Sequence, residues 1–465
     1  MLARRHGELV GLFQQMREPD GITGAAAALT DWLEMKGLPD LARRVATSHH
    51  FPELVVDLPT EFPLPEGARF VAKGGVPGTV VPAPLMGSLF SAHPHILDQS
   101  GHITITAPRL IQPSSRLARE CPNLDGFSGA LYLEGTGEDR VPWEVLLQQF
   151  KGIHTLGFSR CVLEYRPGLA RKKPESFPAL RSLTLEQCSR MTIEGSHILG
   201  APMFSGIHSL NMVTRTGSGT VPDVLTRKET LPVLGKLALD CPGVHPGHIE
   251  AMPAMSDGGL QSLELKWCVE FDGAGPLMDG FSRGRGDTFD LGVFTPGRDA
   301  EWAGYLERHL KPGHLKKLGF STHVLTPEVI RYLAKAIRVG GIRQLTLEDD
   351  TREPYPLQNW IGELLPALSG LECLRISTWQ PGVAEKIIES KAIGGLSEFS
   401  LIGRIPSIEF LRRHFISQAA RMHRVDLIPL YHRAETGLSL FLEENLRGTS
   451  VEVLRGRYLP AGENA

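Results

Sequence analysis

The stretch that decides the fold is Leu315-Lys-Lys-Leu318-Gly-Phe320, followed 27 residues later by Ile342-Arg-Gln-Leu345-Thr-Leu347. Alternate residues of a β-strand face the same way, so each leucine pair would point into a core, and Thr346 would point away from it. Two strands separated by this length of chain can lie parallel only if the intervening residues form a return path.

Residues 326–340 supply that return path. Thr326 suits an N-cap, Pro327 suits the first helical position, apolar residues follow at helical spacing, and Gly340 follows the end of the helix. The spacing therefore predicts a strand, a helix and a parallel strand. Residues 142–150, 302–310, 359–368 and 407–416 show the same helical logic less completely.

The strand pattern recurs along most of the chain. Its first inward residue falls at Leu156, Leu183, Leu210, Leu237, Leu263, Phe289, Leu318, Leu345, Leu374, Phe399 and Val425. Successive positions are 25 to 29 residues apart, a period typical of stacked repeats. Ile103, Leu131 and Val451 extend the series at its ends. Because Gly286 replaces an apolar residue in the Phe289 unit, a bulge or an irregular loop is expected there. The fold class predicted is an α/β solenoid, in which stacked units share one core.

Cysteines mark the bend after several strands. Cys161, Cys188 and Cys268 each lie five residues after the first inward residue, and Cys241 lies one residue earlier than that position. With this feature, residues from about 124 to 455 resemble the longer, helix-containing class of leucine-rich repeats. The resemblance implies parallel strands on a concave face, helices on the convex face, and a concave surface that binds protein.

The N-terminal part of the sequence reads differently. Residues 1–46 are expected to form a small helical module, and the segment 29–37 weakly resembles a companion domain that precedes repeats in some bacterial proteins. The alternative is an ordinary amphipathic helix pair. Residues 47–122 are rich in proline and are expected to connect and cap the solenoid of residues 123–465. Strand-like segments within them are residues 55–58, 70–71 and 103–106.

Composition excludes several classes of function. The 465 residues carry 49 Lys and Arg against 52 Asp and Glu, a net charge of -3, which argues against a sequence-independent nucleic-acid binder. No stretch approaches the length of a membrane span, so no membrane partner is expected. Six scattered cysteines are too few for a disulfide framework, which favours a reducing, cytoplasmic location.

Candidate catalytic and metal-binding groups are weak. The pairs His49-His50 and His93-x-His95, with Asp98, lack the spacing of a known zinc site, and His245-Pro-Gly-His248 fits a solvated turn. No phosphate-binding loop or nucleophile motif occurs. We therefore expect no enzyme activity, no cofactor and no metal, although an enzyme site in residues 47–122 is an alternative.

The remaining candidates are the outward residues of the strands. Those expected to bind a partner on the concave face are Glu186, Asp240, Glu264, Lys266, Asp290, Glu348 and Arg375. Four of them, Glu186, Asp240, Glu264 and Asp290, would form an acidic stripe that a basic patch on another protein could complement. The alternative is a solvated strand face whose carboxylates are ordinary surface groups.

The function expected from the sequence is that of a non-catalytic scaffold that binds another protein. The alternative is a substrate receptor or adaptor subunit of a larger enzyme complex, docked through the N-terminal helices.

Overall fold

The computed structural model describes residues 22–45, 55–58, 64–108, 124–164, 177–214, 231–240, 260–266, 286–293, 299–349, 357–429 and 438–452, apart from short gaps inside these ranges. The chain forms two compact units, residues 1–234 and 235–465. Each unit combines helices with a sheet that is mostly parallel, as the sequence predicts. The domain boundaries placed at residues 46 and 122 stay predictions.

The second unit is a row of parallel strands in chain order. Its described strands are β11 (Lys236–Asp240), β12 (Ser262–Lys266), β13 (Thr288–Val293), β14 (Lys317–Thr322), β15 (Gln344–Asp349), β16 (Cys373–Thr378), β17 (Glu398–Gly403), β18 (Arg424–Pro429) and β19 (Ser450–Glu452). Each strand pairs in parallel with the next one in the chain. Leu318 lies opposite Leu345, which in turn lies opposite Leu374, so the inward residues align as the spacing predicts.

Of the bulge or irregular loop expected at the Phe289 unit, the bulge is absent from the strand pairing, and the irregular loop stays a prediction. Strand β13 pairs with β12 and β14 without a register shift, and Phe289 is buried between Leu263 and Leu318. Phenylalanine fills the inward position well enough that the missing apolar residue at Gly286 does not disturb the ladder. The loop before Gly286 lies outside the described residues.

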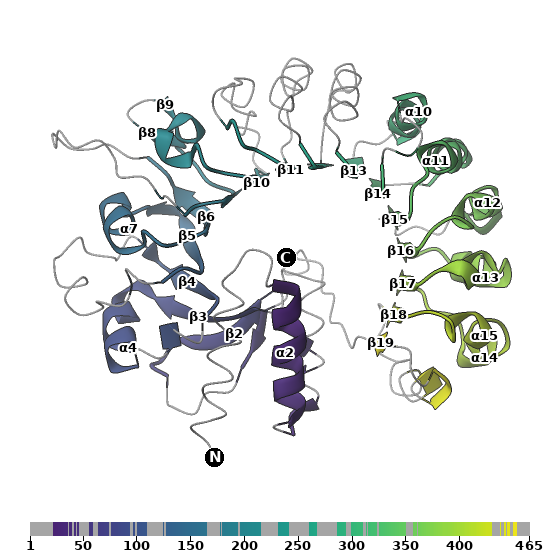
Figure 1. The fold of residues 1–465 in the computed structure, drawn as a ribbon, viewed down its shortest axis with the longest axis horizontal. Coiled ribbons are helices and arrows are strands. Elements are labelled where there is room, and N and C mark those ends of the chain that lie inside the picture. Colours follow the sequence, from purple (N-terminus) through teal and green to yellow (C-terminus); the bar gives the residue numbers. More distant parts are fainter. Residues whose placement is uncertain are drawn as a thin grey trace, which may run out of the picture. The chain divides into compact units, whose positions relative to one another are not determined.

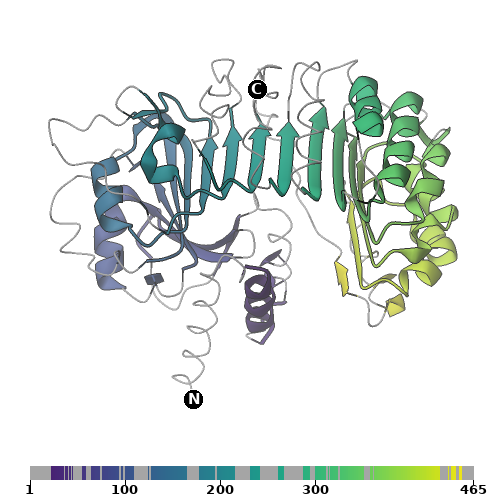
Figure 2. The ribbon, with the colours of Figure 1, turned by 45° about the horizontal axis from the view of Figure 1, so that its top comes forward.

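The helices of this unit lie on one side of the strands. They are α10 (Asp299–His309), α11 (Pro327–Gly340), α12 (Leu365–Leu368), α13 (Val383–Glu389), α14 (Ile408–His414) and α15 (Ile416–Ala419). Figure 1 shows strands β14 to β18 on the inner side of a bend with these helices outside, and Figure 2 shows the same layering, green to yellow, from a second direction. The helices expected at 302–310 and 407–416 are confirmed. The one expected at 359–368 is largely replaced by 3₁₀ turns, Leu357–Asn359 and Ile361–Glu363, before α12.

Helix α11 shows how the sequence encodes the return path. The Thr326 side chain accepts a hydrogen bond from the Val329 amide at 3.3 Å, and Pro327 occupies the first turn. The helix ends at Gly340, one residue later than predicted, and is capped by Gly341, whose φ of 63° is a left-handed conformation that favours glycine. Its buried side is apolar, as its helical spacing predicts.

The start of each strand is bonded in one recurring way. The carbonyl of Asp287 accepts the amides of Lys316 and Lys317, both at 2.9 Å, and the carbonyl of Lys316 accepts those of Arg343 and Gln344, both at 3.0 Å. The same double acceptance recurs at three later carbonyls, those of Arg343, Glu372 and Ser397. These bonds satisfy backbone donors that the loops would otherwise leave unpaired.

The first unit contains a second row of strands. They are β1 (Val55–Asp57), β2 (Arg69–Lys73), β3 (Val76–Pro82), β4 (His102–Thr106), β5 (Ala130–Arg140), β6 (Thr155–Val162), β7 (Ser182–Glu186) and β10 (Ser209–Val213). Pairing is parallel from β3 to β10 through β4, β5, β6 and β7, whereas β1, β2 and β3 are antiparallel. A separate two-stranded ribbon is formed by β8 (Thr192–Ile193) and β9 (Ser196–His197).

The strand segments expected at 55–58, 70–71 and 103–106 are confirmed, as are Ile103 and Leu131 as members of the repeat series, which lie opposite each other. Helix α7 (Trp143–Gln149) confirms the helix expected at 142–150. Strand β3 and helix α4 (Met86–Ala92) were not expected, because prolines at 77 and 82 read as breakers of regular structure.

Helix α2 (Ile22–Met35) covers the antiparallel end of this sheet. Leu29 and Leu33 are buried in one cluster with Val56 and Leu58 of the β1 segment and Ala72 of β2. The N-terminal helix and the β1–β2 pair therefore close the apolar end of the strand row, which is the role expected of a cap.

The helices of the described ranges include none that combines the length and the apolar character needed to cross a membrane.

Candidate functional site

The strand face of the second unit is the side of β11 to β18 that α10 to α15 do not cover (Figure 1). Inward and outward residues alternate along each strand, so the outward residues line up in rows across the sheet. The middle row, read from the strand register, is Ala238, Glu264, Asp290, Gly319, Thr346, Arg375, Ser400 and Asp426. The next row begins with Asp240, Lys266, Gly292, Ser321 and Glu348.

The structure brings most of the expected acidic residues together. Glu264 lies directly opposite Asp290 on neighbouring strands, and Asp240 lies opposite Lys266. Glu264, Asp290 and Asp240 are half-buried rather than fully exposed. Glu186 is exposed at the end of β7, in the first unit. We call Asp240, Glu264, Lys266 and Asp290 the acidic group, because by sequence it contains three carboxylates and one lysine.

A glycine positions one of these carboxylates. A Cβ atom on Gly319 would collide with the carboxylate of Asp290, so the Asp290 side chain lies across the backbone of the neighbouring strand β14. A side chain at position 319 would displace it. Gly319 is thus a functional candidate that the sequence analysis did not identify, although a glycine at an outward strand position is a visible signal.

Glu348 and Arg375 lie further along the same face. The Glu348 carboxylate accepts a hydrogen bond from the Ser321 hydroxyl at 2.9 Å, which holds it against the sheet. Arg375 is half-buried on β16, two strands from Asp426.

An ion pair on β18 was not predicted. Arg424 Nε lies 3.1 Å from Asp426 Oδ1, and their side chains are only 24% and 13% exposed. Burial raises the pKa of Asp426 above its ordinary value, while Arg424 and Arg375 oppose that shift. The face therefore changes along the row from acidic at β12 and β13 to mixed charge at β16 to β18.

The bend cysteines of the first unit have a structural role. The Cys161 thiol contacts the carbonyl of Leu133 at 3.5 Å, and the Cys188 thiol contacts the carbonyl of Phe158 at 3.4 Å. Leu133 and Phe158 hold equivalent positions on neighbouring strands. Each cysteine follows a left-handed residue, Arg160 or Gln187, so the two thiols tie these two bends to the strand before each of them.

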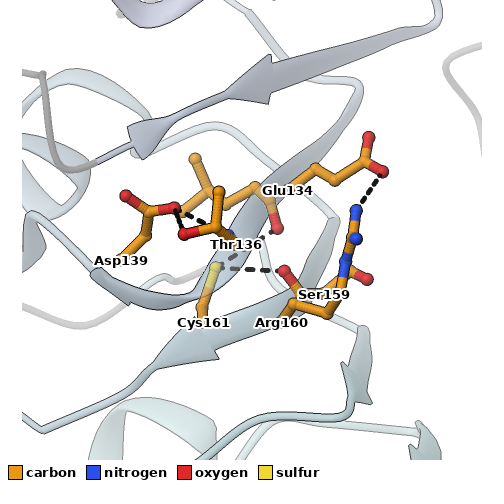
Figure 3. Close-up of polar contacts among 7 residues, drawn as sticks. Glu134, Thr136, Asp139, Ser159, Arg160 and Cys161 are labelled. Atoms are coloured by element: carbon orange, nitrogen blue, oxygen red, sulfur yellow. Dashed lines mark hydrogen bonds and ion pairs between the residues drawn. The ribbon is translucent and has the colours of Figure 1, made fainter.

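A bulge beside Cys161 gathers several polar groups. The register of β5 against β6 shifts between Glu134 and Asp139. Figure 3 shows the Thr136 amide and hydroxyl donating to Asp139 Oδ2, at 2.7 and 2.9 Å, while Arg160 reaches Glu134 at 3.0 Å. These contacts close the bulge upon itself.

The reactivity of the Cys161 and Cys188 thiols tests whether both are buried as the structure shows. Burial raises the pKa of Cys161 from 9.0 to about 12 and that of Cys188 from 9.0 to about 11, so both are protonated near pH 8. Only thiolate reacts with iodoacetamide, so both are expected to be labelled at least about tenfold more slowly at pH 8 in the folded protein than in urea. Mass spectrometry of timed samples measures this, and equal rates in both states would contradict the burial of the two thiols.

The raised pKa values of these two thiols also predict how the stability of the fold depends on pH. Since the folded pKa values exceed the unfolded one, the two thiols stabilise the fold below pH 9 and lose that contribution as the pH rises towards 11 and 12. The free energy of unfolding, measured with urea, should therefore fall more between pH 8 and pH 10 for the wild type than for the Cys161→Ala, Cys188→Ala variant.

Most of the metal-binding candidates lie outside the described residues, namely His49, His50, His95, Asp98, His245 and His248. His93 is described and caps the C-terminus of α4. Within the described ranges, no group of three or more His, Cys, Asp or Glu side chains is placed to hold a metal ion.

Comparison of the chain with models of protein families finds no family that matches, and comparison with curated proteins finds no similar sequence.

Proposed function

We propose that the chain is a leucine-rich-repeat-like solenoid that acts as a non-catalytic scaffold and binds another protein on the strand face of its second unit. The observation that carries the proposal is the register. Nine successive strands of the described chain align residue for residue, so one face presents mostly polar rows, and helices α10 to α15 lie on the other side of β14 to β18.

The acidic group is the part of this face best suited to recognition. Neighbouring parallel strands lie about 4.8 Å apart, so Glu264 and Asp290 hold two negative charges at a spacing that two lysine or arginine side chains can match. Both sit on paired backbone that binding need not order, which reduces the entropic cost of association. The partner proposed is a folded protein with a basic patch, and the charges would orient it and speed its association.

Charge reversal tests the proposal. The variant Glu264→Lys, Asp290→Lys is expected to weaken the binding of a purified partner by at least about tenfold, because like charges would then face each other. The partner is first identified by affinity capture with mass spectrometry, and its affinity for wild type and variant is then measured by calorimetry.

The control is Glu385→Lys, Glu389→Lys on helix α13, which makes the same change in net charge on the helix side of the unit. It should bind as the wild type does. Equal affinity for wild type and the Glu264, Asp290 variant, with an unchanged thermal melting curve, would show that this face is not the interface.

One observation favours the alternative, an adaptor docked through its N-terminal helices. Met35 at the end of α2 is 79% exposed and Leu38 is 38% exposed, whereas Leu29 and Leu33 of the same helix are buried. The capture experiment separates the two functions when repeated with Met35→Glu, Leu38→Glu. An adaptor loses one captured protein in this variant and another in the Glu264, Asp290 variant, whereas a simple scaffold loses only the latter.

A further inference from the structure

Three polar side chains from three strands meet on one face of the first unit. His102 begins β4, and Tyr132 on β5 lies opposite Thr104, so the imidazole and the phenol project from the same side of the sheet. Their ring centroids are 6.1 Å apart in an edge-to-face arrangement. Lys73, at the end of β2, places its Nζ 4.8 Å from the centre of the Tyr132 ring.

Two glycines make room for the two rings against the neighbouring strands. A Cβ on Gly78 would collide with the Cγ, Nδ1 and Cε1 edge of the His102 ring, and a Cβ on Gly157 would collide with the Tyr132 ring. Because that edge of the imidazole covers Gly78, Nε2 lies on the edge turned away from it. The two rings lean over opposite neighbours, β3 and β6.

The imidazole is buried with one nitrogen unsatisfied. His102 is only 3% exposed, and within the described part of the chain its Nε2 has no hydrogen-bond partner. Burial, with a smaller contribution from the charge of Lys73, lowers the pKa of His102 from 6.5 to about 3, so the ring is neutral at physiological pH. A buried ring nitrogen without a partner is unfavourable, and in the tautomer that carries the proton on Nε2 a bound acceptor would remove that cost.

We infer that Lys73, Tyr132 and His102 form a binding site for a carboxylate group. The three side chains can offer an ammonium, a phenol O–H and, in the tautomer protonated on Nε2, an imidazole N–H, while a carboxylate has two oxygens that accept several such bonds. Lys73 and Tyr132 are half-buried and open the cluster to solvent.

Charge favours a carboxylate over a phosphate dianion. Since His102 is neutral, Lys73 supplies the single positive charge of the cluster, and among the described residues it makes no ion pair. One carboxylate balances one ammonium. A phosphate dianion would bring a second negative charge into a partly buried site without a second cation, which is unfavourable.

The test follows the His102 ring by NMR in the full chain with ¹⁵N-labelled histidine, its signal being assigned from its loss in His102→Gln. Titration with acetate at constant ionic strength is expected to shift the Nε2 signal saturably. Lys73→Met should weaken acetate binding about tenfold or more, and Lys73→Arg should largely restore it. Arg69→Met is the control, because it removes a cation from the same face of the same strand.

Three results would overturn the inference. They are an acetate affinity unchanged in Lys73→Met, a His102 response that stays linear like that of the exposed His208, and tighter binding of inorganic phosphate than of acetate. The blocked peptide acetyl-Gly-Glu-Gly-amide then distinguishes the source of the carboxylate. Tighter binding than acetate indicates an acidic side chain of a protein, and equal or weaker binding indicates a free small carboxylate; both support the site.

Discussion

Replacing Phe399 with alanine is expected to lower the free energy of unfolding by about 3–5 kcal/mol, the range for removing a buried aromatic ring from a core. Phe399 on β17 is 1% exposed and lies between Leu374 and Val425 on the neighbouring strands. Its ring centroid is 5.8 Å from that of Phe415, which lies between α14 and α15. The ring therefore joins the strand layer to the helix layer, and a cavity there would loosen both.

Urea unfolding followed by circular dichroism measures the loss. Phe410→Ala is the matched control, since Phe410 belongs to the same repeat but is half-buried and packs against His414 on the helix surface, at 4.7 Å between ring centroids. It should cost about 1 kcal/mol or less, because less apolar surface is returned to water. Similar losses for both variants would mean that strand and helix layers do not share one core.

Replacing Gly403 with alanine is expected to destabilise the protein by about 2–4 kcal/mol. Gly403 ends β17 with a φ of 129°, a conformation that residues with a Cβ rarely adopt. An added Cβ would also collide with the carbonyl oxygen of Thr378, its register partner on β16. Backbone cannot move aside as a side-chain end can, so strain and collision act together.

Gly370→Ala supplies the comparison. Gly370 has open space around its Cα and no left-handed φ, so alanine there should change stability by less than about 1 kcal/mol. Thermal melting of both variants checks the difference. If Gly403→Ala melts with the wild type, the close approach of β17 to β16 is not needed for the fold.

The repeat period predicted the strands well because one physical demand recurs at every step. Leu318, Leu345 and Leu374 must face a common core, so their spacing reveals both the strands and their alignment. Helix α11 was predictable for a similar reason, since its cap, proline and apolar spacing all agree.

Features that depend on contacts between distant segments could not be predicted. Strand β3 is buried along almost its whole length, so it lacks the alternation by which a half-buried strand is recognised. The bulge in β5 depends on Thr136 bonding Asp139, whereas the bulge expected at Phe289 is absent because the inward residue packs in register. Helix α13 begins at a left-handed Gly382 without a side-chain cap, which leaves little local signal.

Of the two candidate sites, one could be predicted from the sequence and the other could not. Asp240, Glu264 and Asp290 follow from strand parity alone, and the structure places them on neighbouring strands. The cluster of Lys73, Tyr132 and His102 does not follow, because the antiparallel pairing of β2 brings Lys73 over a ring from β5. The sequence signal for this cluster was two glycines at outward strand positions, Gly78 and Gly157, which leave room for the two rings.

The carbonyls that accept two amides at the start of successive strands give these junctions of the second unit the same backbone bonding. Duplicating or losing one whole unit would present the following strand with the same bonding geometry that it meets now. Gene rearrangement could therefore change the number of repeat units, and with it the length of the molecule, while each new junction keeps the same backbone hydrogen bonds.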